Sequence, residues 1–225
     1  MTATLDERAR RADSLYDARE DGKSVRESLG WLEEVEAAGD YEILWRLGRA
    51  HFFLGQESGD EEEARSSHRR GVNCSARAAA LSPHRVEGHF WLGVNLSLLA
   101  KLSNPLAAAL LALRARRALL RAVRLDAGYH AAGPLRVLAH LESHLPRLLG
   151  GGHQRARTNF QRAVRLAPHN TVTRIYFARL LVKTGDTGGA RAQLEAVINS
   201  PMDPAWAFEA ARDRRLAREM LKDLS

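Results

Sequence analysis

A pattern of large and small apolar residues, of the kind found in helical repeats of about 34 residues, recurs along the chain, and it restricts the fold more than any other feature. The clearest copy covers residues 171–203. Its apolar residues at positions 7, 8, 11, 20, 24 and 27 are Phe177, Ala178, Leu181, Ala190, Leu194 and Val197. Spacings of three, four and seven residues place side chains on one face of an α-helix. Each copy therefore predicts two helices that pack against each other.

Five such copies follow one another, at about residues 9–40, 41–84, 86–128, 132–169 and 171–203, and a further amphipathic stretch occupies 204–224. This arrangement is typical of tetratricopeptide repeats. We therefore expect an all-α fold, a tetratricopeptide-type right-handed helical solenoid in which residues 1–225 form one domain. The last stretch is expected to be a C-terminal capping helix. Gly48 and Gly93 occupy small-residue positions, where two helices should cross closely.

Two stretches depart from the repeat. Residues 55–71, GQESGDEEEARSSHRRG, lengthen the turn of the second copy, and their charge predicts an exposed loop. Residues 105–125 predict one long helix, which Asn104 can cap and Pro105 can begin. The first half of that helix is apolar on nearly all sides. We expect the protein's own neighbouring helices to cover it, and the alternative is a partner subunit or lipid.

The formal net charge is +7, and arginine supplies nearly all of the positive charge. A basic chain can bind nucleic acid or anionic lipid. These arginines are spread along the sequence, however, without a dense run interleaved with aromatic residues. We therefore expect no nucleic-acid partner. The most apolar stretch, residues 105–113, is about half as long as a membrane span, so no span is predicted.

The N-terminal residues are charged from Asp6 onward and include no apolar segment of the kind that a signal peptide needs. As written, the sequence predicts a cytoplasmic chain, or a periplasmic one if a leader has been removed.

Residues that could perform chemistry are few. Cys74 is the single cysteine and lies in a small-residue helical pattern, so we interpret it as a packed core thiol. His140 and His144 have a spacing that can hold a metal, but no matching third ligand stands nearby. The glycines at 150–152 could offer backbone amides to an anion, although a flexible turn is the favoured interpretation. Because no nucleophile elbow, phosphate loop or carboxylate pair is recognisable, we expect a binding protein without metal, cofactor or enzymatic activity.

A binding surface can be derived from the repeat, because A-helix positions 2, 5, 9 and 12 or 13 line the concave groove of a tetratricopeptide solenoid. Counting along the copies gives these candidate groove residues: Trp45, Arg49, Phe52, Phe90, Arg136, His140, Arg179 and Lys183. Such a groove has an aromatic end and a cationic end, which suits a protein or peptide partner or a small anionic ligand. The alternative is that each aromatic residue packs between stacked helices. An oligomer is compatible with either interpretation.

The order of the segments is more specific than the repeat alone. YEILWRLGRAHFFLG, HFWLGVNLSLLAKL and the pattern GPLRVL…LP…GGG…A…F…AV.LAP within residues 133–168 resemble the TRAP-transporter T-component (TatT-like) family, and are similar to the related regulator-of-microtubule-dynamics family. The resemblance extends over about residues 9–221. It implies a non-enzymatic helical protein, and T components are regarded as periplasmic lipoproteins that help a solute-binding protein deliver small organic ligands to a transporter.

Two functions are therefore expected from the sequence. The first is a non-enzymatic scaffold whose concave groove binds a peptide or protein. The alternative is a TatT-like accessory protein that binds small organic anions for a TRAP-type transporter.

Overall fold

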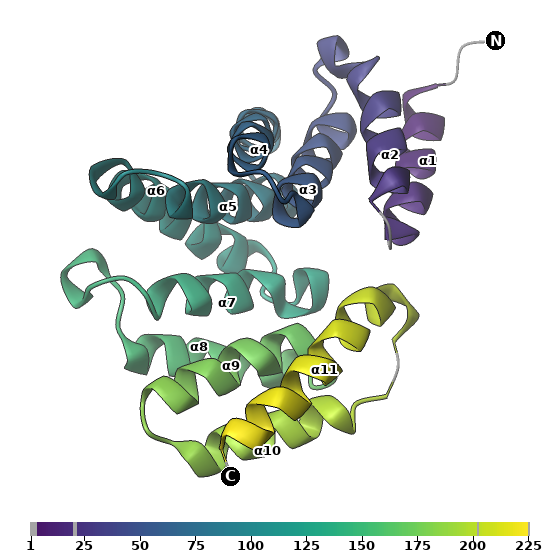
Figure 1. Ribbon diagram of the computed structural model, residues 1–225. Coiled ribbons are helices and arrows are strands. Elements are labelled where there is room, and N and C mark those ends of the chain that lie inside the picture. Colours follow the sequence, from purple (N-terminus) through teal and green to yellow (C-terminus); the bar gives the residue numbers. More distant parts are fainter. Residues whose placement is uncertain (1–3, 20–21, 202, 225) are drawn as a thin grey trace. The chain divides into compact units, whose positions relative to one another are not determined.

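The computed structural model describes residues 4–19, 22–201 and 203–224, and all regular secondary structure in these residues is helical (Figure 1). The α-helices are α1 (Leu5–Asp17), α2 (Lys23–Glu33), α3 (Tyr41–Glu57), α4 (Glu61–Leu81), α5 (Val86–Lys101), α6 (Pro105–Leu125), α7 (Tyr129–Glu142), α8 (His153–Leu166), α9 (Thr171–Lys183), α10 (Thr187–Ile198) and α11 (Ala207–Asp223). Short 3-10 turns among the described residues include η2 (Glu36–Ala38), η3 (Arg147–Leu149) and η4 (Pro204–Trp206). The predicted all-α fold is confirmed, and each sequence copy corresponds to one pair of successive helices.

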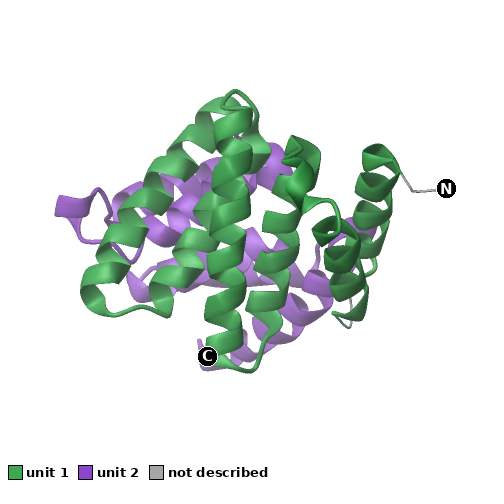
Figure 2. Cartoon of the chain, turned by 90° about the horizontal axis from the view of Figure 1, so that it is seen from above, with its two compact units in different colours: residues 1–125 green, residues 126–225 purple. Residues whose placement is uncertain are grey.

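The chain divides into two compact units, residues 1–125 with α1 to α6 and residues 126–225 with α7 to α11 (Figure 2). Within each unit, every helix packs on the helix that follows it in the sequence. Each unit has its own buried apolar residues. That residues 1–225 act as one domain stays a prediction.

Close helix crossings in unit 1 depend on glycine, as the sequence predicts. A Cβ atom on Gly48 would lie 2.1 Å from the hydroxyl of Ser75 on α4, and one on Gly93 would lie 2.6 Å from Leu119 on α6. Gly88 makes a still less adjustable contact, because a Cβ atom there would lie 2.6 Å from the backbone nitrogen of Ala79. These positions set how closely α3, α4, α5 and α6 approach one another.

The core of unit 2 has two neighbouring parts. Phe160 of α8 and Phe177 of α9 stack with their ring centroids 5.6 Å apart and pack with Leu181 and Ala190. Around Ile175, the second part joins α9 and α10 to α11 through a set of apolar side chains: Ala178, Leu194, Val197, Leu216, Ala217, Met220 and Leu221. Figure 1 shows α11 lying across α9 and α10. The final helix thus covers the last repeat, as a capping helix is expected to do.

The loop predicted for residues 55–71 is wrong, because α4 begins at Glu61 and only a short turn separates it from α3. The carboxylate of Asp60 caps α4 by accepting a 2.7 Å hydrogen bond from the Glu63 amide. Glu61 and Glu62 add negative charge to the first turn, where the helix dipole favours it. The acidic residues that suggested a loop therefore stabilise the start of a helix.

The long helix predicted for residues 105–125 is confirmed, and Asn104 caps it through a 3.0 Å hydrogen bond from the Ala107 amide. Its expected cover by neighbouring helices is wrong for three leucines. Leu106, Leu110 and Leu113 are 76%, 59% and 39% exposed. The helix runs for 21 residues beside the 16 residues of α5, so α6 exceeds the length of the helix with which it pairs.

The turn before α8 uses its own backbone amides. Gly150, Gly151 and Gly152 donate to the carbonyl groups of Arg147, Pro146 and Glu142, at 2.8–3.1 Å. These amides are therefore engaged within the protein and are not offered to an anion. Separately, none of the helices in the described residues combines the length and hydropathy needed to cross a membrane.

Candidate functional site

The candidate groove residues lie in both units. In unit 1, Arg49 of α3 pairs with Asp13 of α1 at 2.6 Å, and Arg46 pairs with the same carboxylate at 2.7 Å. The guanidinium of Arg49 also lies over two rings, 4.1 Å from the centroid of Tyr16 and 5.1 Å from that of Trp45. The charge of Arg49 is therefore compensated inside the unit, at a contact between α1 and α3.

The predicted aromatic end also contains a carboxylate, Glu42, which occupies position 2 of its copy in the repeat count. The indole of Trp45 donates a 2.8 Å hydrogen bond to Glu42, which also pairs with Arg46 and Arg85. Burial alone would raise the pKa of Glu42, but hydrogen bonds from Trp45, Arg85 and Arg46 hold it at about 2. Glu42 is consequently ionised at neutral pH and ties α3 to the start of α5.

The two phenylalanines of the predicted groove pack against Trp91 of α5. The ring of Phe90 lies 4.8 Å from the Trp91 ring and that of Phe52 lies 5.3 Å from it, measured between centroids. Phe90 is buried and Phe52 is partly exposed. Much of this aromatic surface therefore contributes to helix packing, which was the alternative interpretation for Trp45, Phe52 and Phe90.

In unit 2, Arg136 of α7 is only 5% exposed. Its Nη1 donates to the carbonyl oxygen of Ala131 at 3.0 Å, to Oδ1 of Asn170 at 3.3 Å and to the hydroxyl of Thr173 at 3.4 Å. Asn170 caps α9, so this arginine joins the beginning of α7 to the beginning of α9. Residues at the start of each helix thus supply the acceptors for one buried cation.

The surroundings of Arg136 include residues that the repeat pattern did not indicate. The ring of Trp206 lies over the guanidinium, with its centroid 5.3 Å from Cζ. Burial lowers the pKa of Arg136 to about 10, although Tyr176, Glu209 and Asp213 act in the opposite direction. Burial also raises the pKa of Asp213, which accepts a 2.8 Å hydrogen bond from Thr171. Charged groups here are held in an environment that disfavours charge.

A strained segment adjoins this cluster. His130, Ala131 and Ala132 have φ values of 51°, 52° and 57°, in the left-handed region that non-glycine residues rarely occupy. Such residues cost roughly 1–3 kcal/mol each and persist only where surrounding contacts hold them. Here Arg136 binds the Ala131 carbonyl and the ring of Trp206 lies 4.8 Å from that of His130.

The remaining candidates of unit 2 lie further along α7 and α9. His140 stacks on Tyr176 with ring centroids 4.6 Å apart, and His144 Nδ1 lies 2.8 Å from the His140 carbonyl oxygen. Arg179 and Lys183 are exposed, one helical turn apart on α9. Among the described residues, no three His, Cys, Asp or Glu side chains are grouped to hold a metal ion.

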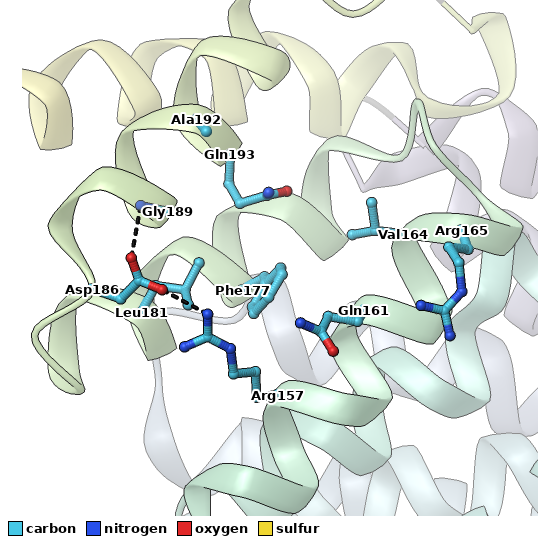
Figure 3. Close-up of a pocket in the computed structure, with 10 residues that line it drawn as sticks. All are labelled: Arg157, Gln161, Val164, Arg165, Phe177, Leu181, Asp186, Gly189, Ala192 and Gln193. Atoms are coloured by element: carbon cyan, nitrogen blue, oxygen red, sulfur yellow. Dashed lines mark hydrogen bonds and ion pairs between the residues drawn. The ribbon is translucent and has the colours of Figure 1, made fainter.

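A hollow of about 440 Å³ lies between α8 and α10, with Phe177 and Leu181 of α9 at its floor (Figure 3). Arg157 and Arg165 stand on the α8 side and Gln193 on the α10 side. Arg157 pairs with Asp186 at 2.7 Å across one end. The repeat count did not point to this hollow, because its walls come from the B helices α8 and α10 and its floor from positions of α9 that were not counted as groove positions.

The sequence offered unequal signals for the residues that were missed. Asn170 stands directly before a periodic helix, so its role as a cap is readable. Trp206 lies outside the repeat, and nothing in the local pattern indicates that it covers Arg136. Cys74 behaves as predicted, since it is 2% exposed and burial raises its pKa to about 12, which keeps the thiol protonated.

A comparison with protein families matches residues 43–225 to the family described as TRAP transporter T-component. A comparison with curated proteins finds no match.

Among solved structures, the chain is similar to TTC0263, a thermophilic TPR protein of Thermus thermophilus. The TM-score is 0.69 at 19% identity, covering 93% of this chain and 98% of that one. This likeness supports the tetratricopeptide-type helical-repeat fold. Yeast Tom70 also matches, with 13% identity over 98% of this chain and 65% of that one, but its TM-score of 0.34 is too low to support an argument.

Proposed function

The chain belongs to the TRAP transporter T-component family, and from this membership we propose that it is a non-enzymatic accessory component of a TRAP-type transporter. Its role is to bind a protein of that system through the side chains of its A helices. The observation that carries the proposal is the family match, which extends from residue 43 to the end of the chain. A helical-repeat fold supports it, because stacked helix pairs present extended surfaces that suit protein partners.

The chemistry of the partner follows from the exposed charge on α9. Arg179 and Lys183 are exposed and share one face of the helix, and in the described residues neither has a carboxylate partner. In unit 1, by contrast, Arg46 and Arg49 are already paired with Asp13. Complementary charge increases association rates and selects partners. We therefore expect the partner to bring acidic side chains to α9.

The sequence leaves two locations open, and the family membership favours the periplasmic side of the membrane over the cytoplasm. Fractionation of cells that express the native gene distinguishes the two. Recovery of the protein in the cytoplasmic fraction alone would contradict a role beside a solute-binding protein.

The binding experiment is a pull-down with the solute-binding protein of a TRAP transporter from the same organism. Reversing both charges on α9, Arg179→Glu with Lys183→Glu, should weaken binding at least tenfold, since two charge pairs become repulsive. Arg215→Glu with Arg218→Glu on α11 makes the same change in net charge at exposed positions and should bind as the native chain does. Failure of the native protein to bind, or equal binding by both variants, would refute the proposal.

A further inference from the structure

We propose that Arg136, Asn170 and Thr173 form a binding site for the carboxylate of a small monoanionic ligand, and that Trp206 covers this site. The inference goes beyond the protein-binding role proposed above and rests on residues of unit 2 alone.

Arg136 leaves one edge of its guanidinium unused. Its neighbours Ala131, Asn170 and Thr173 all accept from Nη1. In the part of the chain that the structure describes, Nε and Nη2 donate to no acceptor, and no carboxylate lies within ion-pair distance. A guanidinium pairs with a carboxylate through two parallel N–H groups, and the Nε–Nη2 edge offers such a pair. A buried cation without an anion is costly, so a ligand that supplies one is bound favourably.

The side-chain amide of Asn170, beside that cation, is not fully satisfied. Oδ1 of Asn170 accepts from the Thr173 amide at 3.0 Å and from the Thr173 hydroxyl at 2.9 Å, in addition to Arg136. Nδ2 of the same amide is buried and has no partner in the described residues, and Asn170 as a whole is 6% exposed. A buried donor that lacks an acceptor loses free energy that an added acceptor restores. Nδ2 belongs to the same planar amide as Oδ1, so it lies close to the guanidinium.

Strained backbone lies beside these donors. The left-handed residues His130, Ala131 and Ala132 direct the Ala131 carbonyl to Nη1 of Arg136. Because this carbonyl occupies Nη1, the opposite edge of the guanidinium is left for another acceptor. Strained backbone of this kind collects at ligand sites, where it holds binding groups in place.

The nature of the ligand follows from the charges and rings around the site. One arginine supplies one positive charge, while Glu209 and Asp213 are near enough to influence it. The single positive charge of Arg136 can compensate one negative charge on a ligand, so the second charge of a dianion would have no cation to pair with. The rings of Trp206 and His130, 4.8 Å apart, offer apolar surface next to the guanidinium. A carboxylate with an apolar body fits these features.

Trp206 is suited to be a movable cover. It lies on η4, a single 3-10 turn that the side chain of Asp203 caps, and it is only partly buried. Its ring contacts Arg136 and His130 but it is not part of the apolar set that holds α11 on α9 and α10. The ring can therefore move without dismantling the packing of α11.

The test follows the indole N–H resonance of Trp206 in ¹⁵N-labelled full-length protein, assigned by its loss in Trp206→Phe. Sodium octanoate is titrated at constant sodium concentration, and octanol, which has the same chain without the charge, is the matched probe. We expect a saturable shift of the Trp206 resonance with octanoate and none with octanol. No saturable shift with octanoate, or an equal response to octanol, would overturn the proposal.

Variants connect the response to the arginine. Arg136→Lys keeps the positive charge but loses the two parallel N–H donors of the guanidinium, and should weaken octanoate binding at least tenfold. Arg215→Lys, at an exposed position of α11, should leave it unchanged. Arg136→Met should abolish the saturable shift, and if it does not fold, Arg136→Lys decides the outcome. Unchanged affinity in Arg136→Lys would show that the arginine serves only the packing of α7 and α9.

Discussion

Gly88 lies where the first turn of α5 meets the backbone of α4, and its missing side chain is a requirement of that contact. A Cβ atom would lie 2.6 Å from the Ala79 nitrogen and 3.0 Å from the Ala78 carbonyl carbon. Gly88→Ala should therefore destabilise the protein by about 1–3 kcal/mol, because backbone atoms cannot rotate away. Gly30→Ala is the control, since a Cβ atom there meets nothing within 4 Å. It should be neutral or stabilise α2 by about 0.5–1 kcal/mol. Urea denaturation measures both, and an equal effect of the two changes would contradict the crossing.

His51 makes the stability of unit 1 depend on pH. It is 3% exposed, its Nε2 has no partner in the described residues, and burial lowers its pKa to about 4. An unfolded chain, with a histidine pKa of about 6.5, binds more protons than the folded chain between these values. The contribution of His51 to the free energy of unfolding is therefore at its maximum above about pH 6.5. It falls as the pH falls toward 4, by about 3 kcal/mol at most.

The measurement for His51 is urea denaturation at pH 7 and pH 5. We expect the native protein to lose stability between these values, and His51→Leu to lose clearly less. His169→Gln, at an exposed position, should behave as the native protein does. Identical losses in all three proteins would show that another group accounts for the acid sensitivity.

At the scale of elements, the helix pairs were predictable because their signal is local. The spacings of Phe177, Leu181 and Ala190 fix a helix face whatever lies beyond them. The start of α4 was missed because acidic residues were interpreted as loop-forming, although Asp60 and the carboxylates after it are the usual start of a helix. The left-handed turn at residues 130–132 could not be predicted, since the ring that packs on His130 belongs to Trp206, far away in sequence.

The capping role of α11 gives a test at this scale. Ala217 is fully buried against Ile175 and Leu194, while its neighbour Arg218 is exposed. Ala217→Asp places an unpaired charge in that contact and should cost roughly 3–5 kcal/mol. Arg218→Asp changes the charge further but should have little effect on stability. Limited proteolysis of the C-terminal segment, read by mass spectrometry, should detect release of α11 in the first variant alone. Equal cleavage of both would contradict the cap.

For the molecule as a whole, the candidate site shows what a repeat count can and cannot provide. Counting placed Arg136 on an inner face of its helix pair, but the count carries no information about what covers that face. The charges that were taken as free, such as Arg49, are in part paired with Asp13. Pairing depends on which helices adjoin, and sequence spacing within one helix does not record that.

The prediction of one domain can be tested through the tryptophans. Trp31, Trp45 and Trp91 belong to unit 1 and Trp206 to unit 2, so a Trp206→Phe protein reports on unit 1 alone. Phe160→Ala in that background empties a fully buried site in unit 2 and should destabilise it by about 3–5 kcal/mol. If the chain is one domain, tryptophan fluorescence and far-ultraviolet circular dichroism should shift to the same lower urea midpoint. An unchanged fluorescence midpoint would mean that the units unfold separately.

The exposed leucines of α6 also affect how strongly the folded protein binds to an apolar chromatography resin. Leu106, Leu110 and Leu113 recur at helical spacing and so form one stripe on the helix. Salts such as ammonium sulfate are excluded from protein surfaces and strengthen contacts between apolar groups. In such a salt the stripe should bind the phenyl groups of a phenyl resin, so a correctly folded chain should be retained on it. Strong retention would then be a property of the native state and no sign of misfolded material.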